Sequence, residues 1–357
     1  MLHTDAEHRR NQNLARLVEG HAEDFIGLLH ASPMKVEKAA RVTDCVRLGY
    51  TPLGYRVADL TVVQTQGRFH LFHIPRVGEN GCLDPANEHW FGHAVSDDLD
   101  TWITQNPPLY AEPNNYFESA HIWAPFVLEH EKTWYMFYTG LTAEPSQVLC
   151  MASSTDPDLN VWQRFEGNPI IPLEGLPWHW PNPQGHVRQA RDPHVVWTGN
   201  HFLMAYTTMH ANGCPAVGGL ISTDLKQWED IGPIFYRPMK PGEWMPESVN
   251  IQQLPDGQWV LIPSISPGLE YYLSDDPHHW HDAQAHQIKI IGSRNSDAIG
   301  PEILCRDDEK GKWLVGYFEN TDNRFYLGVL NIREWELERL RDPAQLEPWR
   351  SLIGKNS

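Results

Sequence analysis

The sequence predicts an all-β fold, a five-bladed β-propeller preceded by a short N-terminal helical extension. Three observations lead to this prediction: a turn motif that recurs along the chain, a near-regular spacing between its copies, and a β-hairpin pattern that opens each unit. Self-similarity at a fixed long period is the sequence signature of repeat architectures, and propeller blades of four strands are one of them. We therefore expect one blade from each repeat.

The turn motif combines Ser, Asp and Trp, with Leu in most copies. Its clear copies end at Trp102, Trp162, Trp228 and Trp280, and a degenerate fifth copy ends at Trp335. Successive tryptophans are roughly 52 to 66 residues apart, which suits four strands with their loops. Five copies predict five blades.

An acidic residue opens the hairpin in three of the five units. Asp59, Asp192 and Glu247 each precede the aromatic residue after the hairpin turn by roughly 10 to 12 positions. Equivalent positions in a radial repeat lie at equivalent heights on the innermost strands, so these acids are expected to converge at one mouth of the central channel. The second unit has no acid at this position, and the fifth has Pro301-Glu302-Ile303.

The parts of the chain outside the repeats predict shorter elements. Residues 1–50 have helical or mixed periodicity interrupted by Pro33 and are interpreted as a helical extension. Residues 51–335 form the predicted catalytic propeller, and residues 336–357 a C-terminal helix and tail, with the helix beginning near Glu334. From the length that follows the fifth blade, no second β-sandwich domain is expected. Residues 175–189, rich in Pro, Trp and His, suit either a loop over the active face or packing between blades.

Composition excludes some classes of function. The net charge of −18 argues against binding to nucleic acid or to an anionic membrane, because a phosphate-tracking surface needs basic patches. The 15 Trp, 12 Tyr and 12 Phe can build interblade packing and can also stack on sugar rings. The expected partner is a small oligosaccharide or glycoside, and the N-terminal segment and the aromatic residues are consistent with a homodimer.

The cysteines and the N-terminus predict the compartment. Five cysteines with no paired spacing indicate reduced thiols, and no metal site or cofactor is specified by the spacing of Cys and His. Residues 1–10 are polar and charged, without an apolar signal segment, which predicts a cytoplasmic protein.

Carboxylates around a sugar-sized pocket meet the chemical requirement of glycoside cleavage. One must protonate the departing oxygen, and another must act as a nucleophile or activate water. A third can bind substrate hydroxyls or tune the pKa of the acid. Acids in turns are common on protein surfaces, but Asp59 and Asp192 lie within apolar runs, where an unpaired charge is unfavourable.

An ordered set of segments resembles the five-bladed module of glycoside hydrolase family 32 and its relatives in families 68 and 43. The segments are Gly67-Arg68-Phe69-His70-Leu71-Phe72, His89-Trp90-Phe91-Gly92-His93-Ala94-Val95-Ser96-Asp97-Asp98-Leu99, Tyr138-Thr139-Gly140, Arg191-Asp192-Pro193 and Glu243-Trp244-Met245-Pro246-Glu247-Ser248. The resemblance covers roughly residues 52 to 330 and is specific for the fold as an ordered set.

The resemblance implies a role for each acid. Asp59 matches the nucleophile of retaining fructosidases and the general base of inverting family 43 enzymes, Asp192 the residue that binds sugar hydroxyls and stabilises the transition state, and Glu247 the general acid. The other expected substrate-binding residues are Arg191, His93, His121, Trp123 and Asn250.

Two departures from the family pattern leave the substrate and the mechanism open. The family 32 stretch Asn-Asp-Pro-Asn-Gly is replaced by residues 57–61, Val-Ala-Asp-Leu-Thr, and the usual Glu-Cys pair is Glu247-Ser248. The leading expectation is a glycosidase of terminal furanosides, most similar to β-fructofuranosidases. The alternatives are an inverting arabinofuranosidase or xylosidase of the family 43 type, and a propeller that binds carbohydrate without cleaving it.

Overall fold

The computed structural model describes residues 48–52, 54–76, 88–142, 146–172, 176, 189–238, 247–264, 268–291, 298–319 and 324–353. Apart from residues 48–50, the predicted N-terminal helical extension lies outside the described residues. So does most of the segment 175–189.

Three blades are separate four-stranded antiparallel sheets. Blade one contains β2 (Arg56–Thr65), β3 (Arg68–Arg76), β4 (Gly92–Ser96) and β5 (Ile103–Thr104). Blade two contains β6 (His121–His130), β7 (Thr133–Leu141), β8 (Gln147–Ser154) and β9 (Gln163–Arg164). Blade three contains β10 (Ala190–Trp197), β11 (Phe202–Met209), β12 (Pro215–Ser222) and β13 (Glu229–Tyr236). In each sheet the strands follow one another in chain order.

Blades four and five are joined at their outer edges into one sheet. Blade four contains β14 (Glu247–Gln253), β15 (Trp259–Ser264), β16 (Leu269–Ser274) and β17 (His286–Ile291). Blade five contains β18 (Ala298–Asp307), β19 (Lys312–Glu319), β20 (Phe325–Asn331) and β21 (Glu336–Arg339). The outer strands β17 and β21 pair in parallel, with Ile290 opposite Leu337. This pairing removes two exposed sheet edges.

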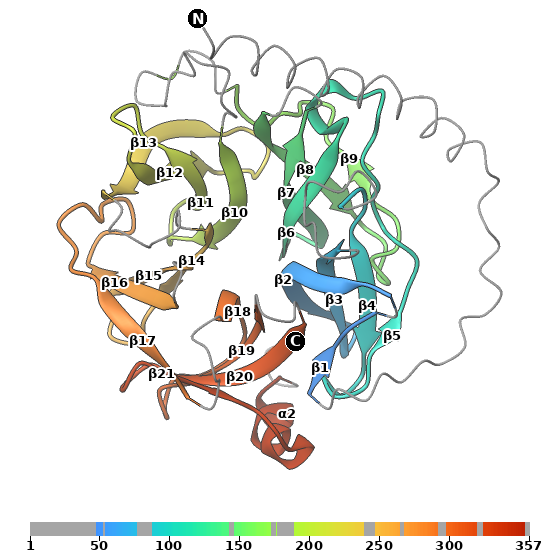
Figure 1. The fold of residues 1–357 in the computed structure, drawn as a ribbon, viewed down its shortest axis with the longest axis vertical. Helices are drawn as coiled ribbons and strands as arrows, with labels where there is room; N and C mark the ends of the chain where they lie inside the picture. The colour runs from blue at the N-terminus through green and yellow to red at the C-terminus, as the bar shows by residue number, and fades with distance from the viewer. Residues whose placement is uncertain are drawn as a thin grey trace, which may run out of the picture. The chain divides into compact units, whose positions relative to one another are not determined.

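The innermost strands close a ring. β2 contacts β6, β6 contacts β10, β10 contacts β14, β14 contacts β18, and β18 contacts β2. In Figure 1 these strands lie nearest the common centre of the five groups. The short strand β1 (Gly49–Tyr50) pairs with β20 of the last blade, so residues that precede blade one in the chain complete blade five. The predicted five-bladed propeller is confirmed.

The recurring turn motif forms the outer corner of a blade. Leu99, Leu159 and Leu225 have φ values of 63°, 52° and 62°, and the following tryptophan donates Nε1–H to the carbonyl of the residue three positions earlier. In blade three the carboxylate of Asp224 accepts two backbone N–H groups at 2.8 Å. Asp and Ser are used here because their short side chains bond the backbone of a tight turn.

The tryptophans of these turns pack against aromatic rings of a neighbouring blade. Trp162 meets Phe72 at 88° between ring planes and Trp228 meets Phe137 at 90°, both at edge-to-face separations. The degenerate copy differs, because Trp335 lies flat on Tyr271 of blade four at 3.8 Å between centroids. These tryptophans are therefore used in packing between blades.

The C-terminal segment differs from its predicted structure. The predicted helix near 334–341 is absent: residues 336–339 form strand β21, which pairs with β20 and extends blade five beyond residue 335. Leu337 is buried between polar neighbours, the alternation of a strand, and β20 offers it an open edge. A 3-10 helix η3 (Pro343–Leu346) and the helix α2 (Glu347–Ile353) follow.

Candidate active site

Every innermost strand is interrupted near its start by an irregularity in its pairing. The register shifts lie between Ala58 and Leu60, Trp123 and Phe126, Arg191 and His194, Glu247 and Asn250, and Ile299 and Glu302. Four residues inside these bulges have left-handed φ values: Ala124 at 47°, Asp192 at 56°, Ser248 at 46° and Gly300 at 60°. Bulges redirect side chains, and backbone strain of this kind clusters at functional sites.

The bulges show which residues of different blades are structurally equivalent. Asp59, Asp192 and Ser248 occupy the bulges of blades one, three and four. Glu247 lies one residue earlier, at the position that Arg191 occupies in blade three. The spacing to the next aromatic residue predicted one height for all three acids, whereas Glu247 is offset by one residue from the other two.

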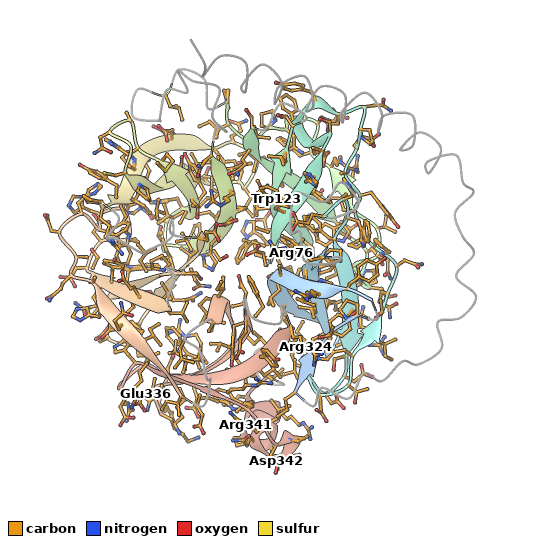
Figure 2. The ribbon with its side chains drawn as sticks, viewed as in Figure 1. Arg76, Trp123, Arg324, Glu336, Arg341 and Asp342 are labelled. Carbon is orange, nitrogen blue, oxygen red and sulfur yellow. The ribbon has the colours of Figure 1, made fainter. Side chains whose placement is uncertain are left out.

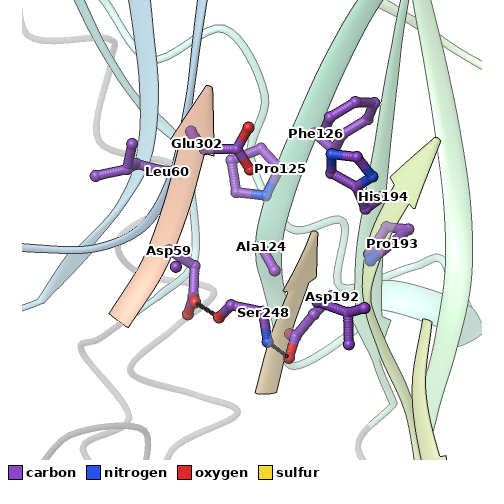
Figure 3. A pocket seen from close by; sticks show the side chains of 12 residues that line it. Asp59, Leu60, Ala124, Pro125, Phe126, Asp192, Pro193, His194, Ser248 and Glu302 are labelled. Carbon is purple, nitrogen blue, oxygen red and sulfur yellow. Dashed lines mark hydrogen bonds between the residues drawn. The ribbon is translucent and has the colours of Figure 1, made fainter. Parts of the chain in front are cut away.

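The bulge residues line a small pocket at the centre of the ring. Figure 3 shows Asp59, Ser248 and Asp192 together at one end of it, and Glu302, Phe126 and His194 towards the other. Apolar residues such as Leu60 and Pro125 form much of the wall between them. A small concave site with a few convergent polar groups is the usual form of a ligand pocket.

Ser248 connects two of the predicted catalytic acids. Its Oγ donates a hydrogen bond to Asp59 Oδ1 at 2.7 Å, and its backbone N–H donates to Asp192 Oδ2 at 2.9 Å. Both bonds are drawn in Figure 3. The acids of blades one and three are thus held together by a residue of blade four, which the sequence analysis did not select.

Asp192 is the most enclosed of the three acids. It is 8% exposed, its backbone N–H donates to Thr139 Oγ1 at 3.1 Å, and Thr207 Oγ1 donates to its Oδ2 at 3.4 Å. Burial raises the pKa of Asp192 to about 7; Arg191 opposes this rise, and the charges of Asp59 and Glu247 reinforce it. Asp192 therefore carries a proton in mildly acidic solution.

Arg191 links Asp192 to the third acid. Its Nη2 donates to Glu247 Oε1 at 3.1 Å, and its Nε lies 3.5 Å from Asp192 Oδ2. The side chain of Glu247 is 48% exposed, whereas that of Arg191 is 11% exposed. The site therefore has one accessible carboxylate at its rim and a buried guanidinium that fixes its direction.

Two further ionisable groups lie on the pocket wall and were not among the predicted site residues. Burial raises the pKa of Glu302 well above its usual value, and the charge of Asp59 adds to the rise. Burial lowers the pKa of His194 to about 3, and its Nδ1 accepts the N–H of Ile251 at 3.4 Å. His194 is therefore uncharged near neutral pH, and burial disfavours the charged form of Glu302. The sequence signal for Glu302 was its place directly after the bulge of the fifth repeat.

All the expected substrate-binding residues, Arg191 included, lie outside the pocket lining, as does Glu247. His93 is 1% exposed within blade one, where its Nε2 lies 3.0 Å from His70 Nδ1. Asn250 is equally buried and donates to the carbonyl of Pro301 at 3.1 Å, which ties blade four to blade five. These two residues hold the scaffold rather than facing the pocket.

His121 and Trp123 belong to a stack of rings at the start of β6. His89 lies over His121 at 5.0 Å between centroids, and His121 over Trp123 at 5.9 Å. Burial raises the pKa of Glu88, and Arg76 and the side chain of Trp123 oppose this rise. Figure 2 shows Trp123 and Arg76 near the centre of the view. Arg76 donates its Nε–H to the buried Glu88 at 2.7 Å.

Neither a metal site nor a membrane span was found in the part of the chain that the structure describes. Within the ranges given above, no three or more His, Cys, Asp or Glu side chains are arranged to hold a metal ion. No helix among those residues is long and apolar enough to cross a bilayer. The described cysteines are free thiols, buried at Cys150 and Cys305 and half-buried at Cys214.

Known proteins resemble this chain in sequence and in fold. An acid β-fructofuranosidase of a rose hybrid cultivar is 29% identical over 142 residues, which is 38% of this chain and 21% of that protein. The structure of fructan 1-exohydrolase IIa from Cichorium intybus superimposes with a TM-score of 0.60 at 16% identity, over 82% of this chain and 60% of that one. A thermostable family-43 glycoside hydrolase gives a TM-score of 0.58 at 15% identity, over 81% of this chain and 94% of that one.

These matches differ in how much of each relative they include. The chain spans about a fifth of the length of the rose enzyme, and less than two thirds of the chicory enzyme. The model of the glycosyl hydrolases family 32 N-terminal domain matches residues 60–336, which include Asp192, Glu247 and most of the five blades and begin one residue after Asp59. Because this match covers well over half of the chain, the protein belongs to glycosyl hydrolase family 32.

Proposed function

We propose that the protein is a glycoside hydrolase that cleaves a terminal furanoside, with β-fructofuranosyl units as the preferred sugar. One observation supports this most strongly: Asp59, Asp192 and Glu247 come from three blades and are joined through Ser248 and Arg191. Asp59, Asp192 and Ser248 line one pocket, and Glu247 lies beside it, outside the lining. Glycoside cleavage needs two carboxylates in different roles, and their environments here differ in burial and in partners.

In the proposed first step, Asp59 attacks the anomeric carbon while the glycosidic C–O bond breaks. Glu247 gives its proton to the departing oxygen, and a covalent glycosyl ester forms on Asp59. In the second step a water molecule loses a proton to Glu247 and attacks the same carbon, which releases the sugar and restores both carboxyl groups. The exposure of Glu247 suits this role, because the leaving group departs towards solvent.

Asp192 is assigned to the hydroxyl groups of the bound sugar. In its protonated form it can both donate and accept a hydrogen bond, and Arg191 holds it from the other side. The hydrogen bond from Arg191 fixes the direction of the Glu247 carboxyl group.

The relatives support the choice of sugar. The rose protein is named as an acid β-fructofuranosidase and the chicory protein as a fructan 1-exohydrolase, and both names describe enzymes that act on fructosides. Membership of the same family supports the same class of substrate for this chain.

A second candidate is an inverting furanosidase or xylosidase of the family 43 type. Two observations favour it: Asp59 is flanked by buried Ala58 and Leu60 in place of the family 32 pattern, and this chain covers 94% of the family-43 structure. Retention goes with carboxyl groups about 5 Å apart, and inversion with about 6.5–9.5 Å. The anomeric configuration of the first product, followed by NMR, separates the two mechanisms.

The test is hydrolysis of a small panel of substrates: sucrose, a fructo-oligosaccharide, an aryl arabinofuranoside and an aryl xyloside. The variants are Asp59→Asn and Glu247→Gln, and the controls are Asp275→Asn and Glu229→Gln, which change exposed acids of blades four and three. Cleavage that disappears in the first pair and persists in the controls supports the proposal. Binding of a sugar without cleavage would favour a carbohydrate-binding propeller instead.

A further inference from the structure

Ser248 lies at the centre of the acid group that the proposed function uses. Its side chain holds Asp59 and its backbone holds Asp192, with hydrogen bonds of 2.7 and 2.9 Å (Figure 3). The two acids come from blades one and three, and the serine comes from blade four. One residue therefore sets the relative position of two acids whose negative charges repel each other.

The neighbours of Ser248 restrict its side chain. Its φ of 46° is disfavoured for a residue with a Cβ atom and is imposed by the bulge of β14. Blade five approaches from the other side: a Cβ atom added at Gly300 would lie 3.5 Å from Ser248 Cβ and 3.6 Å from its Oγ. Gly300 therefore leaves room beside the hydroxyl, whose direction is set by its hydrogen bond to Asp59.

The direction of the hydroxyl hydrogen bond decides which acid is stabilised in its charged form. When carboxylates share a site, one of them tends to keep a proton, and a donated hydrogen bond favours the ionised form of its acceptor. A serine hydroxyl has one proton to donate, and here Asp59 Oδ1 accepts it. The second oxygen, Oδ2, remains available to attack.

We propose that Ser248 is a positioning residue, whose hydroxyl keeps Asp59 ionised and turns Oδ2 of Asp59 towards the anomeric carbon. The proposal rests on the nucleophilic role proposed for Asp59. Family 32 motifs place Cys at this position, and a thiol is a weak donor. The serine of this chain therefore changes the charge balance of the site.

The test compares Ser248→Ala, Ser248→Gly and Ser248→Cys by the pH dependence of kcat/KM. Without the hydroxyl, the acidic limb of the profile moves to higher pH by about one unit. In the Ala and Gly variants kcat falls by about tenfold or more while KM changes little, since the lost bond is to a charged group. The Cys variant lies between Ala and the wild type. An acidic limb at the wild-type pH in both Ala and Gly variants would overturn the proposal, whatever their rates.

A second measurement does not depend on turnover. In protein labelled with ¹³C at the Asp carboxyl carbons, the resonance missing from Asp59→Asn belongs to Asp59. Its titration midpoint should rise in Ser248→Ala, and an unchanged midpoint would contradict the proposal. If the wild type cleaves nothing in the panel, the proposed function fails while the titration still decides the role of Ser248. Ser248→Gly guards against misfolding, because glycine accepts the positive φ and keeps the N–H that binds Asp192.

Discussion

Arg191 Nη2 donates a hydrogen bond to Glu247 Oε1 at 3.1 Å, from the position in blade three that Glu247 itself occupies in blade four. Equivalent places in neighbouring repeats thus carry a cation and an anion that meet at the rim of the channel. Nearby, Arg191 Nε lies 3.5 Å from Asp192 Oδ2. This contact makes Arg191 the group that balances the acids around the pocket.

Replacing Arg191 with Gln should change both the rate and the pH dependence. Arg191 lowers the pKa of Asp192, so its removal raises that pKa further and extends protonated Asp192 to higher pH. The loss of a hydrogen bond to a charged group at Glu247 should lower kcat/KM by about 10- to 100-fold. Arg191→Lys, which keeps the charge, is the control and should retain more of the wild-type pH profile. Identical pH profiles for Arg191→Gln and the wild type would contradict this account.

Asp192 should make the free energy of unfolding depend on pH in a defined direction. Its pKa is raised from 3.8 to about 7 in the folded state, so the folded state binds this proton more tightly than the unfolded state. The resulting stabilisation is complete below about pH 4 and is lost as pH rises through about 7, at up to about 1.4 kcal/mol per pH unit.

The measurement is urea unfolding of the wild type and Asp192→Asn at several pH values between 4.5 and 7.5, taken as a difference at each pH. Asn does not titrate, so the advantage of the wild type should shrink as pH rises. A difference that stays constant over this range would show that Asp192 is ionised throughout.

The buried histidines of blade one should make the free energy of unfolding depend on pH in the direction opposite to that of Asp192. Burial lowers the pKa of His73 from 6.5 to about 4, and His70 and His93 are lowered by the same cause. Below pH 6.5 the unfolded state binds protons that the buried histidines of the folded state do not bind. The free energy of unfolding therefore decreases as the pH is lowered from 6.5 to about 4. His73→Phe, which keeps a ring against Tyr50, should lessen this acid sensitivity by up to about 1.4 kcal/mol per pH unit. If the free energy of unfolding depended on pH equally in the wild type and in His73→Phe between pH 6.5 and 4.5, this prediction would be wrong.

The repeats of the sequence were sufficient to predict the fold. Ser, Asp and Trp recur in the turn for a physical reason. Ser and Asp accept hydrogen bonds from the backbone of the turn, and the indole N–H donates to the carbonyl three residues earlier. The degenerate copy at Trp335 was harder to interpret. There the ring stacks on another blade, and the polar residues that follow form a strand, since pairing with β20 outweighs a weak helical pattern.

The convergence of the three acids was predicted from the sequence, but their register was not. Asp59, Asp192 and Glu247 were selected, yet the residue that joins two of them, Ser248, was not. A β-bulge adds one residue on one strand, and spacing to a distant aromatic cannot reveal where that residue lies. The useful signal was local: Arg191-Asp192-Pro193 and Glu247-Ser248-Val249 share one backbone path.

Closure of the ring can be tested at Tyr50. This residue is on β1, which pairs with β20 of blade five, and its hydroxyl lies 2.7 Å from Thr104 Oγ1 of blade one. Its ring is 7% exposed and packs beside Trp102. Tyr50→Ala removes both the apolar ring and the hydrogen bond and should lower the free energy of unfolding by about 3–5 kcal/mol. Tyr50→Phe removes the hydroxyl alone and should lower it by about 1 kcal/mol.

Both variants are compared with the wild type by urea unfolding, with activity measured at a temperature where all three are folded. If β1 closes the ring, Tyr50→Ala should also increase proteolytic cleavage near blade five, because the edge of β20 that pairs with β1 opens while the rest of the sheet remains paired. Tyr50→Phe keeps the ring and should resist cleavage as the wild type does. Loss of stability in Tyr50→Phe equal to that in Tyr50→Ala would assign closure to the hydrogen bond with Thr104 rather than to the buried ring.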